Sequence, residues 1–281
     1  MHQILKLFLP LVVVLFFSNI STAQPPIGKL FIIGGGSRSD KLINQMLATS
    51  NLQKKDYIVV LPMSSEEPDS AYIYLKKQVE KLTPNPIVML NFDKNSTANQ
   101  KLLDSLLRAK LIYICGGDQN RFMKTVQNTA VANTIQNAYQ SGSTIAGTSA
   151  GAAVMSEVMI TGNQKQTSKY EETFDNIRHD NIDTAPGLAL IKTAIIDQHF
   201  LKRSRYNRIL SALVTFPKLI GIGIDDSTAI IISGNTATVV GDSEVIVVQK
   251  PKGIKKHKNN LVSVEKLQMS IYVEGQTFKV Y

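Results

Sequence analysis

The chain has few of the residues that build disulfide frameworks and metal sites. Its 281 residues include one cysteine, Cys115, and four histidines. A lone thiol cannot close an internal disulfide, and so few cysteines and histidines offer no zinc cluster. Cys115 lies in the apolar run LIYIC, which predicts a buried, inert thiol. We therefore expect neither a metal nor a cofactor.

The apolar run at the N-terminus is too short to span a bilayer. LFLPLVVVLFF has 11 residues, whereas a spanning helix needs about 20. The run follows the charge of Lys6 and precedes SNISTAQ, whose Ser21 and Ala23 fit the −3 and −1 positions of a cleavage site. This pattern is typical of a secretory signal peptide. We expect residues 1–23 to be removed on export to the periplasm or beyond; an uncleaved membrane anchor is the alternative.

The remaining chain shows no repeat, low-complexity tract or linker, so residues 24–281 are expected to form a single α/β domain. The formal charge is +9, and the densest basic stretch is QKPKGIKKHK at 249–258. This stretch fits a solvated hairpin loop, or a patch for an acidic polymer or a cell envelope. No aromatic interleaving or DNA-binding motif accompanies it, so nucleic acid is not an expected partner.

In the first half, short apolar runs alternate with amphipathic stretches. The expected strands are 29–36, 57–62, 86–92, 111–117 and 143–149. The expected helices are 40–51, with Asp40 as N-cap, and 69–82, 97–110, 119–142 and 150–159. This alternation favours a parallel sheet with helices on both faces, in which ligands bind beyond the carboxyl ends of the strands.

The second half is less regular. Residues 160–185 are polar and predict a loop or lid. A strand is expected at 189–197, a helix at 198–216 and a strand at 219–226. The runs TAIIIS, TATVVG and SEVIVVQ fit a short antiparallel meander, and residues 270–281 fit a hairpin.

The stretch GTSAGAAV at 147–154 contains the pattern G-x-S-x-G. Small residues of this kind permit a helix to pack tightly on a sheet, with Ser149 incidental. The other interpretation is a nucleophile elbow, in which a sharp strand-to-helix turn presents a serine.

A nucleophilic serine needs a base and an orienting acid. His199 directly follows an expected strand, which makes it the best-placed base; a histidine that only packs the helix start is the alternative. Asp225 and Asp226 end another strand. Alternation sends them to opposite sides, so only one reaches His199, and the sequence alone leaves open which.

Three arginines follow His199 on the expected helix 198–216. Helical spacing puts Arg203 on the face of His199 and Arg208 on roughly the opposite side. Such arginines are either solvated, or bind a substrate carboxylate through two hydrogen bonds.

Four motifs in order resemble the cyanophycinase and aspartyl-dipeptidase family of serine peptidases. They are IYICGGDQNRF, GTSAGAAVMSE, DQHFLKRSRYNRIL and LIGIGIDDSTAI, with FIIGGG near the start, and they cover about residues 28–250. The resemblance implies a three-layer, flavodoxin-like α/β fold akin to class I glutamine amidotransferases. The sheet would be mainly parallel with helices on both faces, followed by antiparallel C-terminal strands. An amidotransferase itself would need cysteine where Ser149 stands.

The resemblance also implies roles. Ser149 would be the nucleophile, His199 the general base and Asp226 the third member, with Gly117 and Ala150 forming an oxyanion hole. The family has glutamate at position 226, so the choice between Asp226 and Asp225 stays open. The substrate-binding residues implied are Gln119, Asp197, Gln198, Arg203, Arg205 and Arg208.

The implied reaction is acyl transfer to water on a peptide or polymer with β-linked aspartate, such as cyanophycin cut to β-aspartyl-arginine dipeptides. An aspartyl or isoaspartyl dipeptidase is an alternative within the family. A catalytically silent, exported binding protein is an alternative of another class. A homodimer is also expected by resemblance.

Overall fold

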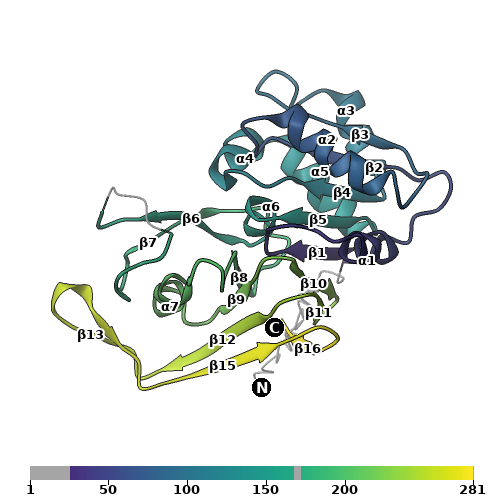
Figure 1. The fold of residues 1–281 in the computed structure, drawn as a ribbon. Coiled ribbons are helices and arrows are strands. Elements are labelled where there is room, and N and C mark those ends of the chain that lie inside the picture. The colour runs from purple at the N-terminus through teal and green to yellow at the C-terminus, as the bar shows by residue number, and fades with distance from the viewer. Residues whose placement is uncertain (1–25, 168–171, 281) are drawn as a thin grey trace, which may run out of the picture.

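The computed structural model describes residues 26–167 and 172–280, so the expected signal peptide at 1–23 lies outside the described residues. An eight-stranded sheet forms the centre, in the order β16-β11-β10-β1-β5-β4-β2-β3. From β1 to β3 the strands are parallel, whereas β10, β11 and β16 are antiparallel additions (Figure 1). Their bounds are β1 Lys29–Ile33, β2 Ile58–Leu61, β3 Ile87–Met89, β4 Leu111–Ile114, β5 Thr144–Thr148, β10 Thr228–Ser233, β11 Thr236–Gly241 and β16 Thr277–Lys279.

Helices cover both faces of this sheet because strand side chains alternate. Phe31 and Ile33 of β1 pack in a core with α1 (Asp40–Ser50) and α2 (Pro68–Val79). Leu30 and Ile32 face the larger core on the other side. That core includes α3 (Gln100–Arg108), α4 (Gln119–Val126), α5 (Ala130–Gln140) and α6 (Ala150–Ala153). The expected three-layer α/β architecture is confirmed.

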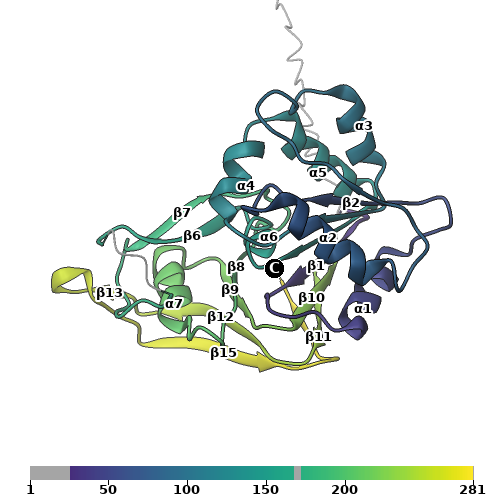
Figure 2. The same ribbon diagram turned by 45° about the horizontal axis from the view of Figure 1, so that its top comes forward.

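A second sheet has the order β15-β12-β9-β8. Its bounds are β8 Ala194–Gln198, β9 Ile220–Ile224, β12 Val245–Lys252 and β15 Lys266–Tyr272. One face packs against α7 (Tyr206–Thr215), as Figure 2 shows, and the other belongs to the larger core of the first sheet. The two sheets therefore share one apolar interior.

Three expected helices have different bounds. The stretch 119–142 is two helices, because Asn128 has a left-handed φ of 59° and the Thr129 side chain caps α5. The stretch 150–159 is helical only to Ala153. The stretch 198–216 becomes helical only at Tyr206, because a turn precedes it in which His199 and Ser204 have positive φ. In α1, Ser39 and not Asp40 is the N-cap, since its hydroxyl accepts from the Leu42 N–H.

The pairing of the later strands also differs from expectation. Residues 160–185 are not simply a loop, because β6 (Val158–Gln164) and β7 (Ile182–Pro186) pair in antiparallel fashion. The meander is limited to β10 and β11, because β12 joins β9 and β15 in the second sheet. The prediction of a hairpin at residues 270–281 is wrong, since β15 pairs with β12 and β16 pairs with β11. Alternating hydrophobicity predicts a strand without naming its partner.

The basic stretch lies on an exposed arm. Beyond β12 the chain forms β13 (Lys255–Lys256), a short 3₁₀ turn (Lys258–Asn260) and β14 (Val262–Ser263), at the far end of the second sheet in Figure 1. No helix within the described ranges is long and apolar enough to cross a membrane. The same ranges contain no group of three or more potential metal ligands.

Candidate active site

Ser149 lies at a sharp turn between β5 and α6. Its backbone has φ 52° and ψ −110°, and such a conformation costs a residue with a Cβ about 1–3 kcal/mol. The strand and helix approach closely because two glycines face each other: a Cβ at Gly147 would lie 2.6 Å from the carbonyl carbon of Gly151. Tight packing alone accounts for the glycines but not for the strained serine between them.

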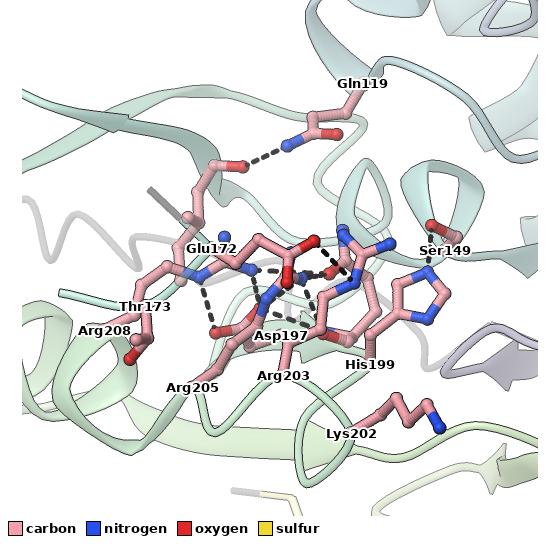
Figure 3. A network of polar contacts seen from close by, with 12 residues as sticks. Gln119, Ser149, Glu172, Thr173, Asp197, His199, Lys202, Arg203, Arg205 and Arg208 are labelled. Carbon is pink, nitrogen blue, oxygen red and sulfur yellow. Dashed lines mark hydrogen bonds and ion pairs between the residues drawn. The ribbon is translucent and has the colours of Figure 1, made fainter. Parts of the chain in front are cut away.

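His199 meets Ser149 from the second sheet. Ser149 follows β5 of the first sheet, whereas His199 directly follows β8. The Ser149 Oγ and the His199 Nε2 are 2.9 Å apart (Figure 3). The His199 N–H donates to the Gly34 carbonyl over 3.0 Å. A Cβ at Gly35 would lie 2.6 Å from the His199 Nδ1, so backbone covers the imidazole directly and only glycine fits there.

The two adjacent aspartates separate as strand alternation requires. The Asp226 carboxylate is hydrogen-bonded to the His199 Nδ1. The Asp225 carboxylate faces away, accepting from the Lys202 N–H and the Ser243 hydroxyl, each over 2.9 Å. The residue next to the imidazole is therefore Asp226.

The environment of His199 favours the neutral imidazole. Burial lowers the pKa of His199 below its usual 6.5. The Arg203 and Arg205 guanidinium groups act in the same direction, and Asp226 opposes them. A neutral imidazole hydrogen-bonded to a serine hydroxyl can accept its proton.

A buried ion-pair cluster lies behind these residues. The Asp197 side chain is 1% exposed and those of Arg205 and Arg208 are each 2% exposed. Arg208 binds Asp197 through two hydrogen bonds, one of them Nε to Oδ2 at 2.9 Å. Arg205 lies 3.5 Å from the same carboxylate and donates to the Gln198 carbonyl over 2.6 Å. Two guanidinium groups thus contact the same carboxylate.

This cluster corrects the expected positions of the arginines. Because residues 199–205 form a turn, Arg208 does not lie on the side of a helix opposite His199 as expected, and it reaches Asp197 together with Arg205 (Figure 3). Only Arg203 is substantially exposed, at 34%, where it lies 3.6 Å from Glu172. Neither buried arginine is a solvated surface residue.

Replacing Asp197 with asparagine is expected to lower the free energy of unfolding by about 3–5 kcal/mol, because both buried guanidinium groups lose their carboxylate. Urea denaturation of the purified variant measures this loss. The matched control is Glu274→Gln, which breaks the exposed pair of Lys41 and Glu274 and should change stability far less. Equal denaturation midpoints for the two variants would contradict a structural role for the buried cluster.

A cavity of about 310 Å³, which we call the polar pocket, opens between Ser149 and the arginines. Among the residues lining it are Gly117, Gln119, Ser149, Gln198, Arg203, Arg205 and Arg208. Gln119 is held by its amide, which donates to the Thr161 carbonyl over 2.8 Å. Asp197 and Ala150 do not line the pocket: Asp197 supports the arginines from behind, and Ala150 is buried under the elbow.

The N–H groups of Gly117 and Ala150 find no hydrogen-bond partner within residues 26–167 and 172–280. Of the two residues, Gly117 lines the polar pocket. Cys115 is buried, and burial raises the pKa of its thiol to about 12. It therefore remains a protonated, unreactive thiol.

Several residues around Ser149 are not among the site residues expected from the sequence. Asn120, Thr161 and Asn163 line the polar pocket beside the expected residues. A second cavity that meets the first at Ser149 is lined in part by Arg38 and Tyr74. The only sequence signal for Arg38 is its place just after the glycines that end β1.

Comparison with known proteins places these features in context. The model of peptidase family S51 matches residues 30–240. A cyanophycinase of Nostoc sp. is 30% identical over 238 residues, covering 81% of this chain and 76% of its own length. A cyanophycinase of Thermosynechococcus vestitus is 27% identical over 266 residues, covering 90% and 79%. A peptidase structure from an acI-B1 actinobacterium has a TM-score of 0.65 at 21% identity, covering 90% of this chain and 97% of its own.

Proposed function

The chain belongs to peptidase family S51 and is a serine-type peptidase, and from this premise we propose that Ser149, His199 and Asp226 form its catalytic triad. The observation that carries the proposal is a continuous polar contact from Asp226 through His199 to Ser149, opening onto an arginine-lined pocket. The family membership favours an enzyme over a silent binding protein.

The proposed reaction is acyl transfer to water. Asp226 accepts from the His199 Nδ1–H and keeps Nε2 free to take the Ser149 proton. The Ser149 Oγ attacks the amide carbonyl, and the Gly117 and Ala150 N–H groups stabilise the resulting oxyanion. His199 then gives the proton to the leaving nitrogen, the C–N bond breaks, and water hydrolyses the acyl-enzyme with His199 as base.

The polar pocket suits an acyl group with a negative charge. Arg203, Arg205 and Arg208 meet there, and Gln119 and Gln198 add amide groups. Guanidinium groups bind carboxylates through paired, charge-assisted hydrogen bonds. We infer that the pocket holds a carboxylate carried by the acyl unit, which in cyanophycin is that of the β-linked arginine, with Asp197 positioning the pocket arginines.

The proposed substrate is cyanophycin, released as β-aspartyl-arginine dipeptides, which requires cleavage of the aspartate backbone with each β-amide intact. This proposal is supported by the two relatives described above, both of which are named cyanophycinase. An aspartyl or isoaspartyl dipeptidase is the second candidate. The cavity of about 310 Å³ lies at the lower end of the roughly 300–1,000 Å³ usual for small-molecule pockets, which favours a short peptide or a chain end.

The test is to incubate the purified protein with insoluble cyanophycin, beside Ser149→Ala, and to follow soluble products by mass spectrometry. Release of β-aspartyl-arginine by the wild type alone supports the proposal. Hydrolysis of β-aspartyl dipeptides without attack on cyanophycin would overturn cyanophycin as the substrate and favour the dipeptidase.

The pH dependence of kcat/KM should have its acidic limb below pH 6.5. The general base works only when neutral, and burial lowers the pKa of His199 from 6.5, so activity rises as the pH increases through that lowered value. Initial rates at low substrate concentration between pH 4 and pH 8 measure the limb. Arg203→Met should move the limb towards higher pH, because the Arg203 charge lowers the pKa of His199. A limb above pH 7 in the wild type would contradict the assignment.

We propose further that residues 1–23 direct export, so that the enzyme digests its substrate outside the cytoplasm. The support is the charged, apolar and small-residue pattern of this segment. Finding the uncleaved protein only in the cytosol would refute this.

The homodimer stays a prediction, which light scattering of the purified protein checks.

A further inference from the structure

A second cavity of about 300 Å³ meets the polar pocket at Ser149. We call it the Arg38 pocket. Its lining residues that matter here are Arg38, Tyr74, Tyr113, Thr148, Ser149 and His199. They come from the loop after β1, from α2, and from the ends of β4, β5 and β8. Ser149 is the one residue that both linings contain, whereas His199 lines only the Arg38 pocket.

The Arg38 guanidinium is held in place by neutral groups. Its Nε and one terminal nitrogen both donate to the Gln78 side-chain oxygen, over 3.1 Å and 3.0 Å. Gln78 donates back to the Arg38 carbonyl over 3.1 Å. The guanidinium carbon lies 5.0 Å from the centre of the Tyr74 ring. Among the residues that the structure describes, no carboxylate pairs with Arg38, so its charge is positioned but not neutralised.

Two buried hydroxyl groups line the same pocket. Tyr113 is 1% exposed and Thr148 is 5% exposed. Neither hydroxyl makes a hydrogen bond of normal geometry within the described residues. The Thr148 side chain is nevertheless near enough to oppose the rise in the pKa of Tyr113. Burial raises the pKa of Tyr113 to about 12, so its hydroxyl stays protonated and able to donate. Buried hydroxyls without partners are costly, and a ligand oxygen would satisfy them.

The position of His199 indicates which part of the substrate belongs here. In the proposed function, on which this inference rests, His199 gives its proton to the leaving nitrogen. The leaving residue must therefore start beside His199, and the Arg38 pocket is the cavity that His199 lines.

We propose that the Arg38 pocket binds the leaving residue of the substrate and that Arg38 pairs there with a carboxylate on that residue. The enzyme then prefers the bond before a carboxylate-bearing residue, such as the last bond of a peptide or a polymer chain. The acyl part fills the polar pocket, and the two parts separate as an acyl-enzyme and a free amine.

The test uses three synthetic peptides that share the acyl unit aspartate with β-linked arginine. The leaving residue is alanine with a free carboxyl, alanine amide, or aspartate amide. The leaving residue of the first peptide carries a carboxylate on its main chain, and that of the third carries one on its side chain. The leaving residue of the second peptide carries none. We expect wild-type kcat/KM to be roughly 10- to 100-fold higher for at least one carboxylate peptide than for alanine amide. Which of the two is preferred identifies the source of the carboxylate.

In Arg38→Met the ratio of kcat/KM for the preferred carboxylate peptide to kcat/KM for the alanine amide peptide should fall close to one. Arg38→Lys should retain part of the wild-type ratio. Arg108→Met, at the exposed end of α3, is the matched control and should keep the wild-type ratio. A wild-type ratio near one, or an unchanged ratio in Arg38→Met, would overturn the inference. Hydrolysis of none of the three peptides would count against the proposed function, and the same comparison then uses calorimetric affinities for Ser149→Ala. Equal affinities for acid and amide in that variant overturn the pocket assignment.

Tyr113→Phe separates a binding role from a structural one. Removing a hydroxyl that has no partner should leave the melting temperature unchanged or raise it, yet should raise KM for the preferred carboxylate peptide. A lower melting temperature with unchanged KM would assign the hydroxyl to folding and contradict its part in binding.

Discussion

Replacing Ser149 with alanine is expected to lower kcat by roughly 10⁴- to 10⁶-fold while the protein remains folded. The Ser149 Oγ has one hydrogen-bond partner among the described residues, the His199 Nε2 at 2.9 Å. It does not cap α6, and the turn is held by the Ser149 N–H, which donates to the Ile33 carbonyl over 3.1 Å. Alanine keeps that backbone contact and removes only the group that would attack the substrate.

Steady-state kcat and labelling by a serine-directed fluorophosphonate measure this effect together. The control is Ser105→Ala on α3, whose hydroxyl donates to the Lys101 carbonyl. That variant should keep wild-type kcat and labelling. If Ser149→Ala were labelled normally and kept more than about a hundredth of wild-type kcat, the nucleophile would be another residue.

Asp226→Asn is expected to lower kcat by about 10³- to 10⁴-fold. An asparagine amide can donate to the His199 Nδ1, and this would place the imidazole proton on Nε2. An imidazole protonated on Nε2 cannot accept the Ser149 proton, even though the geometry is kept. Steady-state kcat at pH 7 and circular dichroism of the same sample show whether activity falls without loss of fold.

Asp225→Asn is the matched comparison, because the substitution is the same one residue away. The Asp225 carboxylate accepts from the Lys202 N–H and the Ser243 hydroxyl and has no contact with His199. We expect a lower melting temperature and a much smaller change in kcat. A larger loss of kcat in Asp225→Asn than in Asp226→Asn would reverse the roles of the two residues.

The first half of the fold could be predicted because its strands are short, apolar and buried on both faces, as β1 and β4 illustrate. In the second half the strands from β8 to β12 could also be predicted, but their pairing could not, because it depends on distant residues. The expected helix 198–216 has helical spacing, yet burial of Arg205 and Arg208 against Asp197 accompanies a turn in its first part.

The candidate site could likewise be predicted only in part. Motif and strand position identified Ser149 and His199, whose side chains meet. Alternation separated Asp225 from Asp226 without indicating which one faces His199, since that depends on how β9 packs on the first sheet. Arg38 belongs to no motif, and only the cavity beside Ser149 distinguishes it from a surface arginine.

The contact between Ser149 and His199 joins the two sheets, since Ser149 follows β5 and His199 follows β8. A hydrogen bond of 2.9 Å tolerates only a few tenths of an ångström of sliding before proton transfer slows. Activity therefore depends on how accurately the two sheets pack against each other. Substitutions in the shared interior, far from any reacting atom, can then alter turnover simply by shifting one half of the molecule against the other.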